Sequence, residues 1–216
     1  MRKIPVPMLG FAVAMLAVPV IAVEPIALSS NWNVIGEQAD RCAPRLTGGG
    51  KPPKWAIVRT DGKWGVAETT RDTTDYRFPL CVVDGAAYAN LADVDVSVRL
   101  RPMSGSVDQA GGLAVRVKDP RNYYVVRANA LEDNVRLYVV RDGDRKQFAG
   151  VDQKVSPQQW HSLRLRVVGD RFTVFFDGKQ LFEATDGRLG GAGGVALWSK
   201  ADSVTEFTDL TIDPMP

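Results

Sequence analysis

The chain has few of the residues on which metal sites and acid–base catalysis usually depend. It contains one histidine, His161, and two cysteines, Cys42 and Cys81, in 216 residues. This set is too small for a closed tetrahedral zinc site. The sequence also lacks a Gly-x-Ser-x-Gly elbow, a phosphate-binding loop and a dinucleotide fingerprint. No complete catalytic signature is therefore present.

The chain also lacks a large excess of positive or negative charge. The 27 Lys and Arg residues nearly balance the 25 Asp and Glu residues, which leaves a net charge of +2. Nucleic-acid-binding proteins usually carry a basic patch or run, and the chain has no long run of Lys or Arg. We therefore expect no nucleic-acid partner. Helical periodicity of the apolar residues is almost absent as well, which indicates a β protein.

The longest apolar run lies at the amino terminus, in residues 1–23. Two basic residues precede it, and Val20-Ile21-Ala22 places small residues near its end, as in a cleaved secretory signal. A membrane anchor is the alternative, but residues 8–23 are short for a spanning helix and include Pro19. The sequence predicts a mature protein that begins near Val23, is exported to the periplasm or beyond, and has no membrane span.

Export changes the expected role of the two cysteines. Oxidising compartments favour disulfides, so Cys42 and Cys81 are expected to pair and to tie the loop-rich amino-terminal segment to the sheet. The alternative is a metal site that adds His161 as a ligand.

The length suits one main domain with a sizeable core. Residues 24–54 are expected to form an amino-terminal segment with one strand at 31–35, so that residues 24–35 add an edge strand to the main domain. The Gly-, Pro- and Lys-rich tract at 48–54 is typical of a surface loop. Residues 55–216 are expected to form the main domain.

The clearest β pattern lies at residues 111–140, which we expect to form three consecutive antiparallel strands. Apolar residues recur there with a period of two. The turn residues predict a register in which Val117 pairs with Tyr124 and Ala128 with Val135. One face of these strands is then apolar, and the arginines lie on the other.

Short alternating segments separated by turn residues make up most of the remaining chain. Leu165 and Val174, for example, are expected to share the apolar face of a hairpin at 160–177. Roughly a dozen short strands indicate an all-β fold, an antiparallel two-sheet jelly-roll sandwich. The other expected strands lie at 55–59, 63–67, 80–83, 86–91, 93–101, 146–152, 179–184, 195–198 and 204–212.

Three successive stretches carry a family resemblance: GGLAVRVKDPRNYYVVRANALEDNVRLY, QQWHSLRLRVVGDRFTVFFDGKQLFEATD and GGVALWSKADSVTEFTDLTI. They resemble the concanavalin A-like lectin/glucanase superfamily, most closely the bacterial exported domains grouped with the 3-keto-disaccharide hydrolase-like family. A looser similarity connects them to laminin-G domains. The resemblance covers about residues 90–212, and it implies a sandwich with a concave sheet that faces carbohydrate.

The strongest candidate binding site is a group of cationic, amide and aromatic side chains expected on one face of the central strands. Arg and Asn offer donors for hydroxyl and carboxylate groups, and an aromatic ring can stack on a sugar. A face that merely solubilises the sheet is the alternative. The group comprises Arg116, Arg127, Asn129, Arg136 and Tyr138, joined across the sheet by Trp198 and Lys200.

Candidate catalytic residues are weaker. Related glucanases place a Glu, an Asp and a Glu alternately along one strand, and no Glu-x-Asp-x-x-Glu occurs here. The acidic residues expected near the concave sheet (Glu132, Asp133, Glu183, Asp202 and Glu206) fall mostly in turns or at strand ends. Asp133, His161 and Asp202 are the acid or base candidates, although His161 alternates with core residues as a structural histidine would.

Calcium is a further candidate, because related sandwiches hold it through backbone carbonyls and one Asp, for which Asp209 is the counterpart here. Three functions follow as hypotheses. The first is an exported, monomeric domain that binds a saccharide, of acidic type in view of the arginines. The others are a glycoside-processing hydrolase of the 3-keto-disaccharide hydrolase-like kind and a laminin-G-like module that binds a protein.

Overall fold

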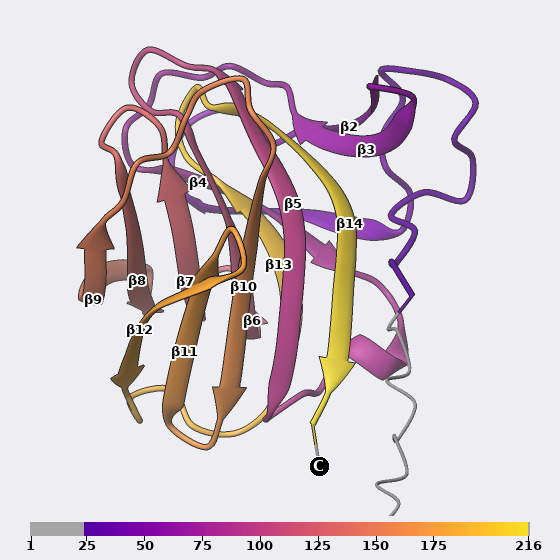
Figure 1. Ribbon diagram of the computed structural model, residues 1–216. Helices are drawn as coiled ribbons and strands as arrows, with labels where there is room; N and C mark the ends of the chain where they lie inside the picture. The colour runs from indigo at the N-terminus through magenta and orange to yellow at the C-terminus, as the bar shows by residue number, and fades with distance from the viewer. Residues whose placement is uncertain (1–23, 216) are drawn as a thin grey trace, which may run out of the picture.

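Two seven-stranded antiparallel sheets pack face to face in the computed structural model, which describes residues 24–215 (Figure 1). Sheet A faces the viewer in Figure 1, and sheet B lies behind it. Sheet A has the order β12 (Lys179–Thr185), β11 (Arg171–Phe176), β10 (His161–Val168), β5 (Val94–Ser104), β14 (Val204–Pro214), β3 (Lys63–Glu68) and β2 (Trp55–Thr60). Sheet B has the order β1 (Cys42–Gly48), β4 (Arg77–Val83), β13 (Gly194–Ser199), β6 (Ala110–Asp119), β7 (Asn122–Asn129), β8 (Asn134–Arg141) and β9 (Asp144–Asp152).

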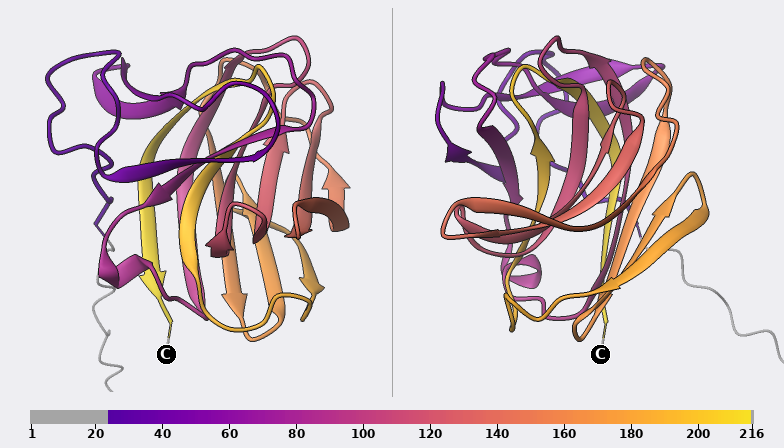
Figure 2. Two further views of the ribbon diagram at one scale, coloured as in Figure 1. Left: turned by 180° about the vertical axis from the view of Figure 1, so that it is seen from behind. Right: turned by 90° about the vertical axis from the view of Figure 1, so that its left-hand side faces the viewer.

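The predicted all-β antiparallel sandwich is thus confirmed, and the two layers are seen edge-on in the right-hand view of Figure 2. The main core lies between the sheets and follows the period of two. Leu165 on β10 pairs with Val96 on β5 and with Val174 on β11, and all three side chains are buried. The predicted 160–177 hairpin register is therefore correct. Along β5, inward residues are buried and the alternate residues are partly exposed.

The predicted register between the first two central strands is wrong by two residues. Val115 pairs with Tyr124, because a bulge interrupts β6 between Val115 and Asp119. Arg116 sits in this bulge with a φ of 49°, a left-handed conformation that a strand residue rarely adopts. The extra residue turns Val117 to the outer face of sheet B, where it joins a second apolar cluster. The pairing of Ala128 with Val135 is as predicted.

The amino-terminal segment differs from its prediction in two ways. Residues 31–35 form turns instead of a strand, and the side chain of Asn31 accepts a hydrogen bond from the backbone of Asn33, which favours a turn. The segment reaches sheet A further along, where Gln38 forms a β-bridge with Ala56. Strand β1, an edge strand of sheet B, was not predicted from the sequence. A short 3-10 helix η1 (Ala86–Tyr88) replaces most of the strand expected at 86–91.

Within residues 24–215, no helix is long and apolar enough to cross a membrane. The secretory signal predicted for residues 1–23 lies outside the described residues.

The Cys42–Cys81 disulfide is confirmed, and it joins the neighbouring strands β1 and β4. Both cysteines are buried. The bond closes a loop of 39 residues, for which the chain-entropy model gives about 4 kcal/mol of stabilisation. The disulfide therefore holds an edge strand that has a partner on one side only.

We expect the purified protein to show no reactive thiol when it is labelled in denaturant without reductant, because a disulfide leaves no thiolate to react. Denaturant is essential to this test, since burial alone would protect free cysteines in the folded protein. After reduction, both cysteines should label. Two labelled thiols before reduction would contradict the disulfide.

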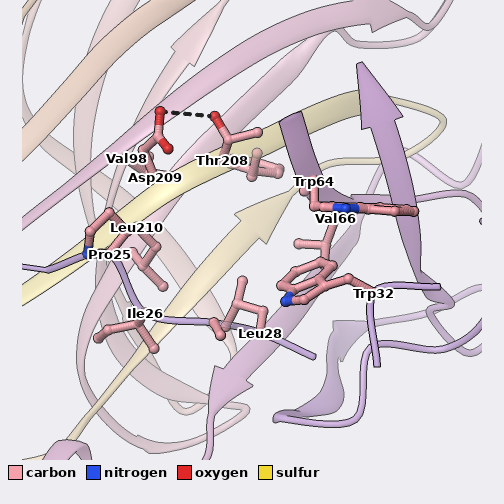
Figure 3. Close-up of a pocket in the computed structure, with 13 residues that line it drawn as sticks. Pro25, Ile26, Leu28, Trp32, Trp64, Val66, Val98, Thr208, Asp209 and Leu210 are labelled. Atoms are coloured by element: carbon pink, nitrogen blue, oxygen red, sulfur yellow. Dashed lines mark hydrogen bonds between the residues drawn. The ribbon is translucent and has the colours of Figure 1, made fainter. Parts of the chain in front are cut away.

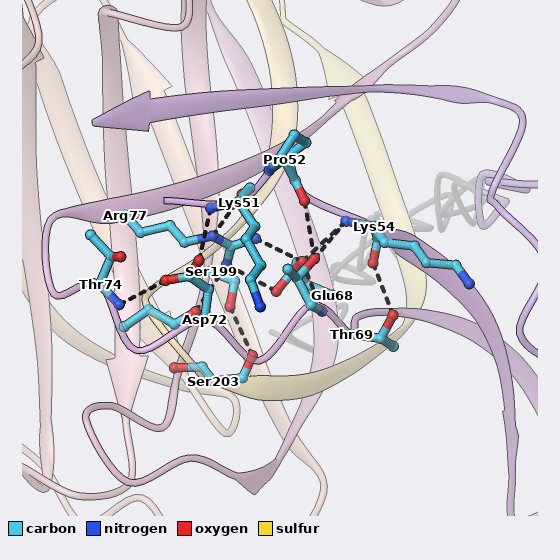
Figure 4. Close-up of polar contacts among 12 residues, drawn as sticks. Lys51, Pro52, Lys54, Glu68, Thr69, Asp72, Thr74, Arg77, Ser199 and Ser203 are labelled. Atoms are coloured by element: carbon cyan, nitrogen blue, oxygen red, sulfur yellow. Dashed lines mark hydrogen bonds and ion pairs between the residues drawn. The ribbon is translucent and has the colours of Figure 1, made fainter. Parts of the chain in front are cut away.

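A buried ion pair links the two sheets at one end of the sandwich (Figure 4). Arg77 of β4 meets Glu68 of β3 through two hydrogen bonds of 3.1 and 3.2 Å, and both side chains are fully buried. Arg77 also donates to the backbone carbonyls of Lys51 and Ala201. The Gly- and Pro-rich loop predicted at 48–54 thus supplies one acceptor, the Lys51 carbonyl, for a buried cation that would be costly to leave unpaired.

Candidate functional site

Aromatic side chains line the outer face of sheet B, the face turned away from sheet A. Phe78 of β4 stacks on Trp198 of β13, with ring centroids 5.5 Å apart and planes at 21°. The indole Nε1 of Trp198 donates to the hydroxyl of Tyr123, which lies 2.9 Å from Thr47 Oγ1. Burial raises the pKa of Tyr123 to about 12. We call Phe78, Tyr123, Tyr138 and Trp198 the aromatic floor; all four are buried.

Arg145 of β9 covers this floor. Its guanidinium carbon lies 4.4 Å from the ring centroid of Phe78, 4.5 Å from that of Tyr138 and 5.7 Å from that of Trp198, a cation–π arrangement. No carboxylate in the described part of the chain forms an ion pair with Arg145, and its buried Nη1 has no hydrogen-bond partner. Burial lowers the pKa of Arg145. A guanidinium that lacks an anionic partner at this face can bind an anionic group of a ligand.

Tyr76 connects the two sides of the aromatic floor. It precedes β4, yet its hydroxyl donates to the carbonyl of Gly143 at 2.7 Å and accepts from the backbone N–H of Arg145 at 3.1 Å. Gly143 and Arg145 belong to the β8–β9 turn and the start of β9, at the opposite side of sheet B from β4. Sheet B is therefore curved, so that residues at its β4 side contact residues at its β9 side across the outer face. The Tyr76 hydroxyl positions the backbone of Arg145.

A polar cluster lies beside the aromatic floor, around Arg127 of β7. Arg127 is 3% exposed and donates to Glu132, Asn134 and Tyr138. Burial alone would lower the pKa of Arg127, but the neighbouring Tyr138 and Glu132 outweigh it and raise the pKa. The Nε of Arg127 is nevertheless buried without a partner. A second guanidinium at this face thus has an unused donor.

Asp108 and Lys200 complete the polar cluster. The Lys200 ammonium lies 2.8 Å from a carboxylate oxygen of Asp108 and 2.8 Å from one of Asp75. Burial opposes the charge of Lys200, but these two partners raise its pKa. Burial raises the pKa of Asp108, and Lys200 counters this effect. Asn129 donates to Asp108 from β7, so the cluster spans β7, the loop before β6 and the residue that follows β13.

The structure brings together most of the residues predicted for ligand binding, but Arg116 lies apart from them and Trp198 is covered. Arg127, Asn129, Tyr138 and Lys200 lie in or beside the polar cluster, and Arg136 pairs with Asp152 nearby on the same face. Arg116 does not share their face, because the β6 bulge directs it towards the carbonyls of Ala92 and Gly169. Trp198 is 0% exposed beneath Arg145, so its ring is not available for stacking on a sugar.

Arg145, Tyr76 and Phe78 were not predicted from the sequence. The predicted strand at 146–152 began after Arg145, and nothing in a period of two shows that the two sides of one sheet will meet. An arginine on an exposed face would contribute little to stability, but Arg127 is an interior residue with three side-chain partners.

The three acid or base candidates are each held by structural contacts. Asp133 pairs with Lys154 and caps the backbone of Val155. The ring nitrogens of His161 face Asp177 and the carbonyl of Ser156, both acceptors. Asp202 accepts from three backbone N–H groups and a hydroxyl in the loop at 106–108. No hydrogen bond joins any two of these candidates within residues 24–215.

Asp209, the calcium candidate, forms an ion pair with Lys63 at 2.9 Å. Among residues 24–215, no group of three or more His, Cys, Asp or Glu side chains could hold a metal ion. The role of Asp209 as a calcium ligand stays a prediction.

No protein-family model and no curated protein matches the chain, but solved structures match it in fold. The carbohydrate binding module CBM66 from Bacillus subtilis superimposes with a TM-score of 0.62 at 18% identity, over 81% of this chain and 97% of that chain. A protein of unknown function with a galectin-like fold, also from Bacillus subtilis, gives 0.56 at 10% identity, over 79% and 89%. The exoplasmic/lumenal domain of VIP36, in its Ca2+/Man-bound form, gives 0.55 at 11% identity, over 80% and 83%. The chain therefore has the galectin-like, concanavalin A-like sandwich fold.

Proposed function

We propose that this protein is an exported domain that binds acidic saccharides on the outer face of sheet B. The observation that carries the proposal is the guanidinium of Arg145, which forms no ion pair within residues 24–215 and shares the ring of Tyr138 with a second guanidinium, that of Arg127. A carboxylate or sulfate group would supply the counter-charge that Arg145 lacks. The fold shared with a carbohydrate binding module supports the saccharide class.

The more exposed residues around the polar cluster would contact the rest of the ligand. Arg136 is partly exposed and pairs with Asp152, whose side chain is 87% exposed. Gly150 lies opposite Arg136, and a Cβ there would come within 2.4 Å of the Arg136 side chain. The glycine therefore leaves room for Arg136 to lie across β9, where an exposed ion pair can exchange partners at little cost.

Export of the protein is part of the proposal. The disulfide suits an oxidising compartment, and the composition of residues 1–23 suits a cleaved signal.

The test is an array of neutral, uronate and sulfated glycans, probed with the mature protein and with Arg145→Ala. Loss of a charge-assisted hydrogen bond of about 1.5–3 kcal/mol should lower affinity for acidic glycans roughly 10- to 100-fold. Arg145→Lys should recover only part of the lost affinity, because an ammonium group cannot form the bidentate hydrogen bonds of a guanidinium. Binding should weaken as salt rises.

Arg141→Ala is the matched control, since Arg141 is exposed at the end of β8. It removes the same charge and should leave acidic-glycan binding unchanged. The thermal midpoint of each variant separates a lost contact from a lost fold. Equal binding by Arg145→Ala and the parent would refute the site.

The glycoside-processing and laminin-G-like hypotheses predict other outcomes of the same screen. A hydrolase of the 3-keto-disaccharide hydrolase-like kind would release shortened products from the glycans that it binds. A protein-binding module would bind no glycan at all.

A further inference from the structure

A cavity of about 210 Å³ opens at the side of the sandwich, away from the outer face of sheet B (Figure 3). Its walls come from the amino-terminal segment at 25–32, from β3, from β5 and from β14. Leu28, Val66, Val98 and Phe207 line it and also belong to the main core. The cavity is therefore an accessible extension of the apolar interior.

Two tryptophans form one end of this cavity. Trp32 and Trp64 lie with ring centroids 6.3 Å apart and planes at 32°, and neither ring is fully buried. Arg59 lies 5.0 Å from the centroid of the Trp64 ring. Partly exposed tryptophans beside an apolar cavity are costly to leave hydrated, and a ligand that covers them gains affinity by removing that surface from water.

The lining has two polar side chains, Thr208 and Asp209, which are adjacent in the sequence. β14 is irregular here, because its pairing with β5 shifts between Thr208 and Thr211. Asp209 adopts a φ of 53° in this irregularity. A bulge and a left-handed non-glycine residue often direct a side chain at a functional site. The Asp209 carboxylate accepts from Lys63 and from the Thr208 hydroxyl through one oxygen, and it keeps 35% of its side-chain surface exposed (Figure 3).

Size and chemistry together indicate one class of ligand. An apolar cavity of about 150 Å³ holds a benzene ring, so a cavity slightly larger than this has room for one ring and a small substituent. Eleven of the thirteen lining residues are apolar or glycine, which suits neither a sugar with many hydroxyl groups nor an anion. We propose that this cavity binds a neutral molecule with a single apolar ring and one hydroxyl group, which donates to Asp209. The site is independent of the proposed saccharide site.

The probe is cyclohexanol, which does not absorb where tryptophan does, added to the mature full-length protein. The indole N–H signals of Trp32 and Trp64, assigned with Trp32→Phe and Trp64→Phe, should shift saturably in NMR spectra, while those of Trp160 and Trp198 stay in place. A ligand of this size should bind with a Kd near the millimolar range. Cyclohexanecarboxylate should bind at least tenfold more weakly, because an ionised carboxylate is costly to bring into an apolar cavity.

Two variants test the location. Ala27→Phe fills the cavity from its exposed rim and should abolish the shifts, whereas Ala87→Phe, at an exposed alanine of η1 that does not line the cavity, should preserve them. Asp209→Asn keeps a residue that tolerates positive φ and should weaken cyclohexanol about tenfold. The proposal fails if no indole signal saturates, if Ala27→Phe binds as well as the parent, or if the carboxylate binds as tightly as the alcohol.

Discussion

Leu165→Asp is expected to abolish folding of the protein. Leu165 is fully buried on β10 between Val96 and Val174, in the core shared by both sheets. A carboxylate there would have no partner, and the cost of burying such a charge exceeds the roughly 5–15 kcal/mol that stabilises a typical domain. Far-UV circular dichroism and solubility after expression measure the outcome.

Arg164→Ala, one residue away, is the control. Arg164 points outward from sheet A and pairs with Asp95, and its side chain is 44% exposed. An exposed pair of this kind contributes about 0–1 kcal/mol, so the variant should fold with a nearly unchanged thermal midpoint. If both positions tolerated their substitutions equally, the inward and outward faces of β10 would be assigned incorrectly.

Glu68→Gln is expected to lower the free energy of unfolding by about 3–5 kcal/mol. The change preserves the shape of the side chain but leaves the guanidinium of Arg77 without its anion, between two sheets where no water reaches it. Breaking one partner of a buried pair costs more than the pair itself contributes, because the remaining charge stays desolvated. Urea denaturation, with the midpoint and the slope both fitted, measures the loss.

Two comparisons make this test specific. Asp144→Asn removes the anion of the exposed Lys146–Asp144 pair, in which both side chains are more than 60% exposed, and should cost well under 1 kcal/mol. The double variant Glu68→Leu with Arg77→Met should recover much of the loss, because apolar side chains of similar volume need no counter-charge. A loss in Glu68→Gln no greater than that in Asp144→Asn would contradict the structural role of the pair.

Much of the fold follows from local pattern. Val94, Val96, Val98 and Leu100 alternate with polar residues, and a strand with this period can bury only one face. The 160–177 hairpin was predictable for the same reason, and its register agrees with the structure. The sequence has only two cysteines, so only one disulfide within the chain was possible.

The failures have two physical causes, which are a local side-chain hydrogen bond in one case and distant contacts in the other. Residues 31–35 have strand-like composition, but the backbone N–H of Asn33 donates to the side chain of Asn31, which stabilises a turn. A bulge interrupts β6 at Arg116, and the Arg116 guanidinium donates to carbonyls of two other segments, at Ala92 and Gly169. A period of two cannot reveal a bulge whose partners lie far away in the chain.

The candidate sites divide in the same way. The sequence alone determined that Arg127, Asn129, Arg136 and Tyr138 would lie on one face of neighbouring strands, because side-chain direction alternates along a strand. Only the tertiary structure decided that sheet B curls over this face, so that Trp198 is covered and Arg145 lies over the rings without an anion. The curvature of a sheet and the meeting of its two sides depend on contacts such as that between Tyr76 and Gly143, 67 residues apart, which no local pattern of residues encodes.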